Sequence, residues 1–207
     1  MGRHTQAKCK LCRRENEKLF LKGEKCLSAK CPFTRRAYAP GQHGNSKRRK
    51  SDSEYGIRLR EKQKARRIYG LTEGQFEGYF DVAVRKKGAT GEKLLEFLER
   101  RLDNVVYRLG FAPSRQAARQ LVRHGGVEVN GQKTNIPSCQ TKPGDAIKIR
   151  PRVIALVKAN QEKFPDHTPP VWLTQKSDNE GEIVAVPKRE EIDTVLEEHL
   201  IVEYYSR

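Results

Sequence analysis

The sequence is poor in apolar residues and contains no long hydrophobic run. Of its 207 residues, 36% are hydrophobic and 33% are charged, and there is one Trp and one Met. No apolar stretch approaches the roughly 20 residues of a membrane-spanning helix, and the first residues, MGRHTQAK, lack the apolar core of a secretory signal. We therefore expect a cytosolic protein without a membrane partner, built around a small core as one large domain or two modest ones.

The sequence also lacks the usual marks of catalysis. It has no glycine-rich phosphate loop, no G-x-S-x-G motif and no pair of carboxylates in an apolar setting. The acidic pairs Glu190-Glu191 and Glu197-Glu198 lie in a polar C-terminal stretch and are typical of surface charge. These absences predict a protein that is not an enzyme and has no small-molecule substrate.

Negative charge is scarce in the first third of the chain. Residues 1–70 hold 21 Lys and Arg against 6 Asp and Glu, a net charge of +15, whereas residues 71–159 carry +7 and residues 160–207 carry −6. This distribution favours a polyanionic partner, because a basic surface releases counterions from nucleic acid. A membrane surface is the weaker alternative, since no basic amphipathic helix with a strong apolar face is present.

Cysteine is rare, but four of the five cysteines lie within the first 31 residues. Cys9, Cys12, Cys26 and Cys31 form a C-x2-C pair and a C-x4-C pair, and two such pairs can place four thiolates around a tetrahedral Zn²⁺. Neighbouring Lys and Arg favour the thiolate form. Because the segment has few apolar residues, binding of one structural Zn²⁺ would supply its folding energy.

Other interpretations of the cysteines stay open. Disulfides require an oxidising compartment, which nothing in the sequence supports, and a redox C-x-x-C motif normally lies in a βαβ unit that this pattern lacks. An iron–sulfur cluster is a minor alternative. His4 or His43 could replace one thiolate, and the lone Cys139 is expected to pack as a small side chain.

A basic loop and a helix follow the cysteines. The stretch FTRRAYAPGQHGNSKRRKSDSEYG is broken by Pro40-Gly41 and Gly44-Asn45, and it predicts an extended loop with aromatic groups that can stack on bases. Ser53 then caps a helix that ends near Gly70, with one positive face that has no acidic partner along it. Such charges are often only solvated, but we favour RNA contacts here. The candidate residues are Arg35, Arg36, His43, Lys47, Arg48, Arg49, Lys50, Arg60, Lys64 and Arg67.

The middle of the chain predicts short helices packed on a small antiparallel sheet. Residues 92–110 carry Leu and Val at the i, i+3, i+4 spacing of a buried helix face. Ser114 then caps a short helix that ends at Gly125-Gly126, and Asn130-Gly131 predicts a two-residue hairpin turn. The arginines of that helix have no acidic residue three or four positions away, so they predict a ridge that binds phosphates along a duplex, with plain solvation as the alternative. The RNA-binding candidates of this module are Ser114, Arg115, Arg119, Arg123, His124, Lys133 and Lys148.

Several motifs resemble a known family. The stretch SRQAARQLVRHGGVEVNG resembles the signature helix and hairpin of the RNA-binding module named after the fourth protein of the small ribosomal subunit. That module also occurs in pseudouridine synthases and tyrosyl-tRNA synthetases, so alone it does not assign a function. The resemblance extends over nearly the whole chain to the bacterial ribosomal family itself, in its zinc-bearing form. It is carried by CKLCRRE, LKGEKC, RRAYAPGQHG, YGIRLREKQKARRIYG, LLEFLERRLDNVVYRLGFAPSR and the final EYYSR.

The resemblance implies a function and its partners. It implies a cytoplasmic, structural component of the small ribosomal subunit, a primary binder of small-subunit rRNA that nucleates assembly of the 5′ domain. It also implies a place near the mRNA entry channel, beside the third and fifth small-subunit proteins, with a contribution to decoding accuracy. Two rivals are an enzyme that carries the module, for which the chain leaves no room, and a zinc-dependent DNA-binding factor, which would need a base-reading helix at finger spacing.

From these observations we expect an α+β fold in three parts. Residues 1–50 form a zinc-bound segment with a basic loop, residues 51–96 a helical body, and residues 97–196 the RNA-binding module with a C-terminal extension. The apolar residues of HLIVEYYSR need cover, so residues 197–207 are expected to return to the helical body. The carboxylates of Glu190, Glu191, Glu197 and Glu198 are expected to face a basic neighbouring protein or this chain's own basic front, and not RNA.

Overall fold

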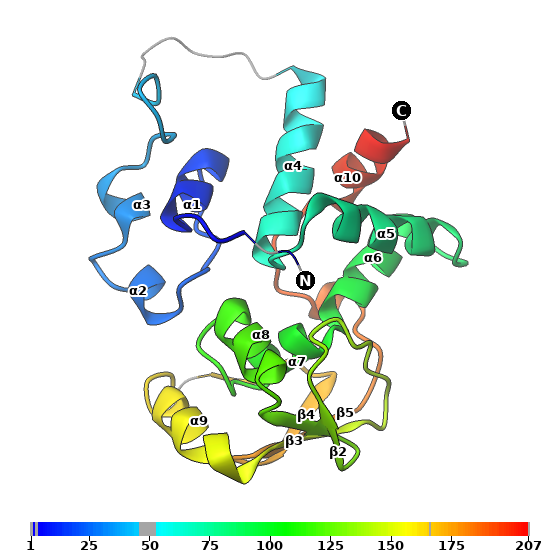
Figure 1. Ribbon diagram of the computed structural model, residues 1–207. Coiled ribbons are helices and arrows are strands. Elements are labelled where there is room, and N and C mark those ends of the chain that lie inside the picture. The colour runs from blue at the N-terminus through cyan, green and yellow to red at the C-terminus, as the bar shows by residue number, and fades with distance from the viewer. Residues whose placement is uncertain (1, 3, 46–52, 166, 207) are drawn as a thin grey trace. The chain divides into compact units, whose positions relative to one another are not determined.

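The computed structural model describes residues 2, 4–45, 53–165 and 167–206, and in it the chain divides into two units (Figure 1). Unit 1 comprises residues 1–91 and 194–207, and unit 2 comprises residues 92–193. Among the helices of the described residues, none has the length and hydropathy of a membrane span.

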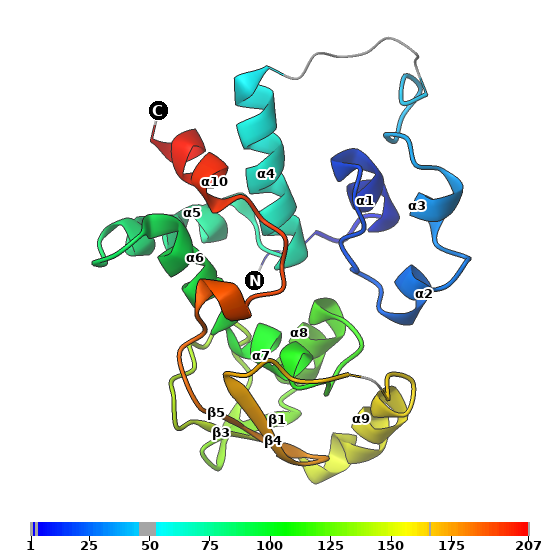
Figure 2. The ribbon, with the colours of Figure 1, turned by 180° about the vertical axis from the view of Figure 1, so that it is seen from behind.

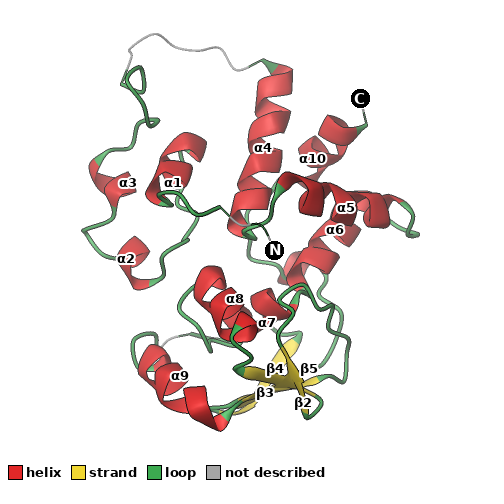
Figure 3. Cartoon of the chain, in the orientation of Figure 1, coloured by secondary structure: helices red, strands yellow, loops and turns green. Residues whose placement is uncertain are grey.

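The described residues of unit 1 form helices joined by loops (Figure 3). The helices are α1 (Cys9–Glu15), α2 (Glu24–Leu27), α3 (Pro32–Arg35), α4 (Glu54–Ile68), α5 (Glu73–Val84) and α10 (Glu198–Tyr205), and α6 (Thr90–Glu99) runs from unit 1 into unit 2. Ser53 begins α4 as predicted, because its hydroxyl accepts a hydrogen bond from the backbone N–H of Gly56 at 3.1 Å. The chain leaves α4 through Gly70, whose φ of 66° suits glycine.

The C-terminal helix α10 packs along α4 within unit 1 (Figure 2). Tyr205 stacks on Phe80 with ring centroids 4.5 Å apart, and its hydroxyl donates to Glu73 at 3.0 Å. Nζ of the buried Lys62 lies 2.5 Å from the same carboxylate oxygen and 4.3 Å from the centroid of the Tyr204 ring. These contacts hold the end of the chain against helices formed by its first 91 residues.

Unit 2 places short helices on a five-stranded antiparallel sheet of order β2-β1-β3-β5-β4. Its elements are α7 (Leu102–Arg108), α8 (Arg115–Arg123), β1 (Val127–Val129), β2 (Gln132–Thr134), β3 (Ala146–Ile149), the 3-10 helix η1 (Pro151–Val153), α9 (Ile154–Gln161), β4 (Leu173–Ser177), β5 (Glu180–Ile183) and the 3-10 helix η2 (Arg189–Glu191). Trp172, Ile147 and Leu109 are among its fully buried core residues. The predicted α+β class with a small antiparallel sheet is confirmed.

The apolar stripe of residues 92–110 is split between two helices. α6 ends at Glu99 and α7 begins at Leu102, because Arg101 is extended (φ −66°, ψ 136°) and forms an isolated β-bridge with Gln140. The stripe is buried on both sides of this break, as its spacing predicted. Its residues Leu94, Leu95, Leu98, Leu102, Val105, Val106 and Leu109 are each 0% exposed.

The sheet consists of two hairpins joined through β3. Asn130 and Gly131 both have positive φ, 51° and 77°, as the two-residue turn between β1 and β2 requires, so this predicted hairpin is confirmed. The second hairpin, β4–β5, lies in the acidic stretch after residue 160, where the sequence predicted no strand. Gly181 of β5 pairs with Ile147 of β3, and a β-carbon at Gly181 would lie 2.6 Å from Cδ2 of Leu109.

Candidate nucleic-acid interface

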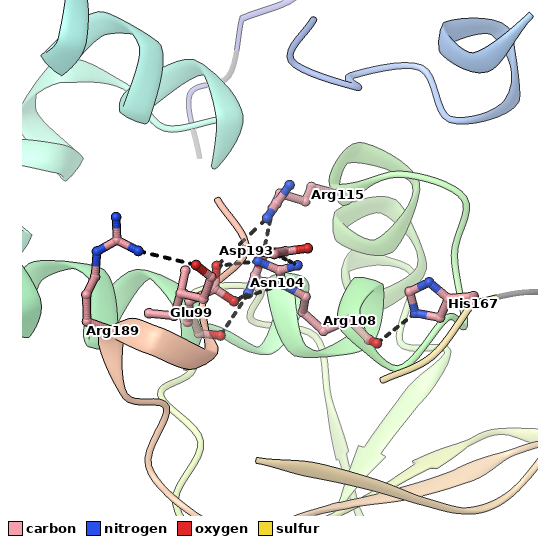
Figure 4. A network of polar contacts seen from close by, with 8 residues as sticks. Glu99, Asn104, Arg108, Arg115, His167, Arg189 and Asp193 are labelled. Carbon is pink, nitrogen blue, oxygen red and sulfur yellow. Dashed lines mark hydrogen bonds and ion pairs between the residues drawn. The ribbon is translucent and has the colours of Figure 1, made fainter. Parts of the chain in front are cut away.

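Glu99, at the end of α6, is the centre of a polar network inside unit 2 (Figure 4). Its side chain is fully buried, and Nε and Nη2 of Arg108 donate to its two carboxylate oxygens at 2.9 and 3.0 Å. Nδ2 of Asn104 donates to the backbone and carboxylate oxygens of Glu99 at 2.9 and 2.8 Å. Nη1 of Arg108 also lies 2.5 Å from Asp193, and Nε2 of His167 donates to the Arg108 carbonyl at 2.8 Å. The network fixes α7 against the end of α6.

Two of the three predicted ridge arginines belong to this buried region. Nε of Arg115 donates to Oδ1 of Asn104 at 2.7 Å, and its guanidinium lies 4.7 Å from the centroid of the Tyr107 ring. Nη1 of Arg119 lies 3.4 Å from Asp103. The side chains of Arg115 and Arg119 are only 14% and 11% exposed. α7 therefore supplies both arginines with polar partners, which the spacing of residues along α8 cannot reveal.

A cluster of basic side chains lies where α8 ends. Arg123 and His124 are exposed, and Arg152 of η1 donates to the backbone carbonyl of His124. Gly125 follows with a φ of 65°, and a β-carbon there would lie 2.6 Å from Cε of Lys133 and 3.6 Å from Nη2 of Arg152. Lys133 of the β1–β2 hairpin thus lies against the turn that ends α8. We call Arg123, His124, Lys133 and Arg152 the α8-end cluster.

Little acidic charge offsets the α8-end cluster. No ion pair joins its four side chains to a carboxylate of the described residues. The neighbouring Arg150 does have a partner, since its Nε lies 3.1 Å from Glu128, and its Nη1 donates to the Gly125 carbonyl at 3.3 Å. Carbonyl groups at a helix C-terminus attract cations, so the end of α8 helps to gather these side chains. The result is an exposed positive patch that phosphate groups can approach.

The other candidates of unit 2 have partners in the fold. The Ser114 hydroxyl caps α8 by accepting from the backbone N–H of Ala117 at 3.3 Å, and the residue is buried. Nζ of the exposed Lys148 lies 2.5 Å from Glu180, and this hydrogen bond raises the pKa of the ammonium group. Arg123, His124 and Lys133 are therefore the predicted RNA-binding residues of this unit that come together on its surface.

In unit 1, the positive face of α4 is paired with the N-terminal segment. Arg60 and Arg67 both form ion pairs with Glu15, whose side chain is 2% exposed. Nζ of Lys64 lies 2.7 Å from Glu17. The prediction of a face without an acidic partner along α4 is wrong, because Nζ of Lys64 also lies 3.6 Å from Glu61 of the same helix. α1 and the residues after it supply two further carboxylates. These side chains attach the cysteine-bearing segment to α4.

Exposed basic residues lie elsewhere in unit 1. Arg35, Arg36 and His43 are exposed. Tyr38 lies between these residues in the sequence; the guanidinium of Arg13 lies 4.8 Å from the centroid of its ring, and Nε of Arg13 donates to its carbonyl at 2.9 Å. Four further RNA-binding candidates lie outside the described residues, namely Lys47, Arg48, Arg49 and Lys50.

The four N-terminal cysteines all carry free thiols. Cys12, Cys26 and Cys31 are buried, and Cys9 is partly exposed. The backbone N–H of Lys22 donates to Sγ of Cys26 at 3.3 Å. Within the described ranges, no three His, Cys, Asp or Glu side chains are arranged as a metal site. The predicted zinc is therefore not confirmed, although four thiols in one small segment are a suitable donor set for it.

The neighbouring lysines and arginines predicted lowered thiol pKa values, and the pKa of Cys31 is lowered whereas that of Cys12 is raised. Burial raises the pKa of the Cys12 thiol, although a backbone hydrogen bond from Leu19 lowers it in part. The other three cysteines of the set raise it further, so the thiols are close enough to repel one another when ionised. Burial also acts to raise the pKa of Cys31, but backbone hydrogen bonds from Phe33 and Thr34 bring it below its usual value.

The carboxylates predicted to face a protein neighbour are divided between the two units. Glu190 and Glu191 lie in η2 of unit 2. Glu197 precedes α10 in unit 1, with its backbone N–H bound to Glu61 at 2.9 Å and its side chain 64% exposed. The aliphatic stem of Glu198 packs on the first turn of α6. Arg152 was not predicted from the sequence. The available signal was the Arg-Pro-Arg motif of residues 150–152, which directly follows the strand β3.

Comparisons with known proteins cover the whole chain. Residues 3–99 match the family model "Ribosomal protein S4/S9 N-terminal domain", and residues 100–147 match the "S4 domain" model. The chain is 54% identical over 208 residues to the small ribosomal subunit protein uS4 of Dictyoglomus thermophilum, and 55% identical over 214 residues to that of Pelotomaculum thermopropionicum. It is 56% identical over 210 residues to the uS4 protein of Thermoanaerobacter sp. strain X514. In each case the match spans 100% of both chains.

These matches confirm the family resemblance seen in the sequence, and they carry no information on zinc. The chain belongs to the uS4 family of small ribosomal subunit proteins, which are structural, non-enzymatic components of the ribosome in the cytoplasm.

Proposed function

We propose that this chain is a primary binder of small-subunit rRNA that nucleates assembly of the 5′ domain of the small subunit. Family membership and a net charge of +16 both favour a polyanionic partner in the ribosome. The S4 domain match, residues 100–147, includes α8 and the β1–β2 hairpin. The proposal assigns RNA contacts to this part of unit 2 and to the exposed basic residues that precede α4.

The observation that carries the proposal is the α8-end cluster. Its cations come from α8, the β1–β2 hairpin and η1, and they gather around one helix end without a carboxylate partner among the described residues. Binding of a phosphate to such a cation releases counterions from the RNA. The logarithm of the binding constant should therefore fall with the logarithm of salt concentration by about 0.7–0.9 per contact.

The test compares two triple variants of the full chain on small-subunit rRNA. Replacement of Arg123, Lys133 and Arg152 by Gln should weaken binding and reduce the salt slope by about two. The matched control replaces the exposed Lys142, Lys158 and Lys176 by Gln, which removes the same charge from other parts of unit 2. The control should keep nearly the native slope. Equal slopes in the two variants would contradict the proposal.

We also propose that Cys9, Cys12, Cys26 and Cys31 hold one structural Zn²⁺. The support is the donor chemistry: three of the four thiols are buried, and they repel one another when ionised. A bound cation would offset that repulsion and would stabilise a segment with little apolar core. The ion would have no catalytic role. It would keep the segment folded, with Glu15 in place against α4.

A third proposal concerns protein neighbours. The family resemblance suggests that the chain lies beside the third and fifth small-subunit proteins, near the mRNA entry channel, and contributes to decoding accuracy. Because rRNA repels carboxylates, we assign Glu190, Glu191, Glu197 and Glu198 to contacts with a basic protein. The exposed side chain of Glu197 supports this assignment.

A further inference from the structure

The side of α8 that faces away from the core carries two glutamine amides and the guanidinium of Arg123. The apolar residues of this helix are buried in the core of unit 2, and Arg115 and Arg119 are held by side chains of α7. The stripe that remains consists of Gln116, Gln120 and Arg123, at positions i, i+4 and i+7 of one helix face. The stripe leads directly into the α8-end cluster.

The two glutamines are available for a ligand. Gln120 is exposed and Gln116 is partly exposed. Neither side-chain amide makes a hydrogen bond to another of the described residues. Other amides of unit 2 are used within the chain, for example Gln140, whose Nε2 donates to the Phe97 carbonyl at 3.1 Å, and Asn104 in the Glu99 network. The two glutamines lie one turn apart, about 6 Å along the helix axis.

We propose that Gln116 and Gln120 are RNA-contact residues that bind ribose 2′-hydroxyl groups in the minor groove of an rRNA duplex. The proposal rests on the proposed rRNA-binding function, and it adds two side chains with which this chain would distinguish RNA from DNA. The α8-end cluster would bind the flanking phosphates and so position the helix on the duplex.

The chemistry of the stripe matches the RNA minor groove. That groove is wide and shallow and displays 2′-hydroxyl groups, so a helix face without a cleft can reach it. A 2′-hydroxyl both donates and accepts, and the glutamine side chain offers both an N–H donor and a carbonyl acceptor. A DNA duplex has no such hydroxyl, so the two amides would lose their partners there. An amide carries no charge, so its contribution should not depend on salt.

The experiment measures the double variant Gln116→Ala/Gln120→Ala in the full chain. Alanine is the strongest helix former, so α8 should stay folded, and the fluorescence of the buried Trp172 checks the fold of unit 2. The matched control is Gln175→Ala, an exposed glutamine on β4, at the sheet edge opposite β2. The probes are small-subunit rRNA, a short RNA duplex and a DNA duplex of the same sequence.

We expect the double variant to bind rRNA about tenfold more weakly with an unchanged salt slope. The preference of the native chain for the RNA duplex over the DNA duplex should fall by a similar factor. Affinity and preference equal to those of the Gln175→Ala control would overturn the inference. A reduced salt slope would overturn it as well, since it would indicate phosphate contacts. Failure of the proposed function has a different sign: the variant with Gln in place of Arg123, Lys133 and Arg152 would then keep the native salt slope.

Discussion

Arg119 of α8 and Asp103 of α7 lie 3.4 Å apart, measured from Nη1 to Oδ2, and this pair joins the two helices inside unit 2. Asp103 also accepts two hydrogen bonds from Arg101, at 3.0 and 2.7 Å. One buried carboxylate thus compensates two largely buried guanidinium groups. Positive charge that the sequence pattern assigned to RNA contacts is thus paired within the chain, and the exposed cation of α8 is Arg123, at its C-terminal end.

The first prediction is that Asp103→Asn destabilises unit 2 by roughly 3 kcal/mol, because it removes a buried negative charge that the guanidinium groups of Arg101 and Arg119 both contact. Trp172 is the single tryptophan of the chain and is buried in the core of unit 2, so its fluorescence reports urea unfolding of this unit. The control Asp178→Asn, in the exposed turn between β4 and β5, should change stability by less than about 0.5 kcal/mol. Equal unfolding midpoints for the two variants would contradict a structural role for Asp103.

The second prediction concerns Gly125. Gly125→Ala should destabilise unit 2 by about 1–2 kcal/mol, because its φ of 65° disfavours a side chain. The new methyl group would also meet Cε of Lys133, so rRNA binding should weaken as the α8-end cluster is displaced. Gly131→Ala is the matched control: its φ is 77°, but a β-carbon there has no neighbour within 4 Å. It should lower stability and leave the affinity near native; equal losses of affinity would count against the cluster.

The third prediction is a pH dependence of unit 1. Burial acts to raise the pKa of Glu73, but the hydrogen bond from Lys62, with help from Tyr205 and Arg66, brings it below its usual value of 4.5. A carboxyl whose pKa is lower in the folded state stabilises fully above its unfolded pKa, and this contribution is lost as pH falls through the folded pKa. Stability of unit 1 should therefore decline from about pH 5 downward, as followed by tyrosine near-ultraviolet circular dichroism.

Glu73→Gln provides the check on this assignment. The variant should lower stability at neutral pH and flatten the acid side of the stability profile, since its amide does not titrate. Asp81→Asn, an exposed carboxyl on the same helix, is the control and should keep the native profile. If both variants kept the native profile, Glu73 would not be the group responsible.

Local signals in the sequence predicted the start of helices and the turn of a hairpin. Ser53 and Ser114 cap their helices, and Asn130-Gly131 forms the predicted turn. These features depend on hydrogen bonds and backbone angles within a few residues, so a short stretch of sequence contains all the information. The apolar stripe of residues 92–110 was predicted for the same reason, although Arg101 divides it through a bridge to the distant Gln140.

Features that depend on distant partners were not predictable. Glu15 pairs with Arg67, and no spacing rule connects residues so far apart in the chain. The β4–β5 hairpin was missed because LTQKS and EGEI have little apolar alternation. Its place in the sheet depends on β3, and on Leu109 occupying the space that a side chain at residue 181 would fill. Partners from distant segments thus bind Arg67 and Arg119, which the sequence assigned to exposed RNA-binding faces.

The fourth prediction concerns the cysteines. Cys9→Ser/Cys26→Ser should abolish binding of one zinc ion per chain, because it removes one ligand from the C-x2-C pair and one from the C-x4-C pair. The segment of residues 9–31 should lose protection in hydrogen exchange, while the Trp172 signal of unit 2 stays native. Cys139→Ser, which removes a thiol outside this set, is the control and should keep the metal. Elemental analysis of the purified proteins decides the outcome: native metal content in the double variant, or none in the native chain, would contradict the zinc proposal.

The last prediction concerns the acidic residues before and within α10. Glu197→Lys/Glu198→Lys should weaken binding of a basic neighbouring ribosomal protein by at most about 1 kcal/mol per exposed pair. Lysine keeps an aliphatic stem, so the packing of residue 198 on the first turn of α6 should survive the change. Repulsion from RNA phosphates can only fall when these carboxylates are removed, so rRNA affinity should be unchanged or slightly higher.

Three measurements distinguish contact of these carboxylates with a basic neighbouring protein from contact with the basic front of this chain. Binding of the free chain to rRNA, its assembly with neighbouring proteins, and the error rate of reconstituted subunits are compared with those of Glu162→Lys, an exposed glutamate outside the proposed interface. We expect native rRNA binding, loosened protein association and lower decoding accuracy for the double variant alone. Weaker rRNA binding would instead mean that Glu197 and Glu198 organise the basic surface of this chain, because charge reversal there would then disturb cations that RNA needs.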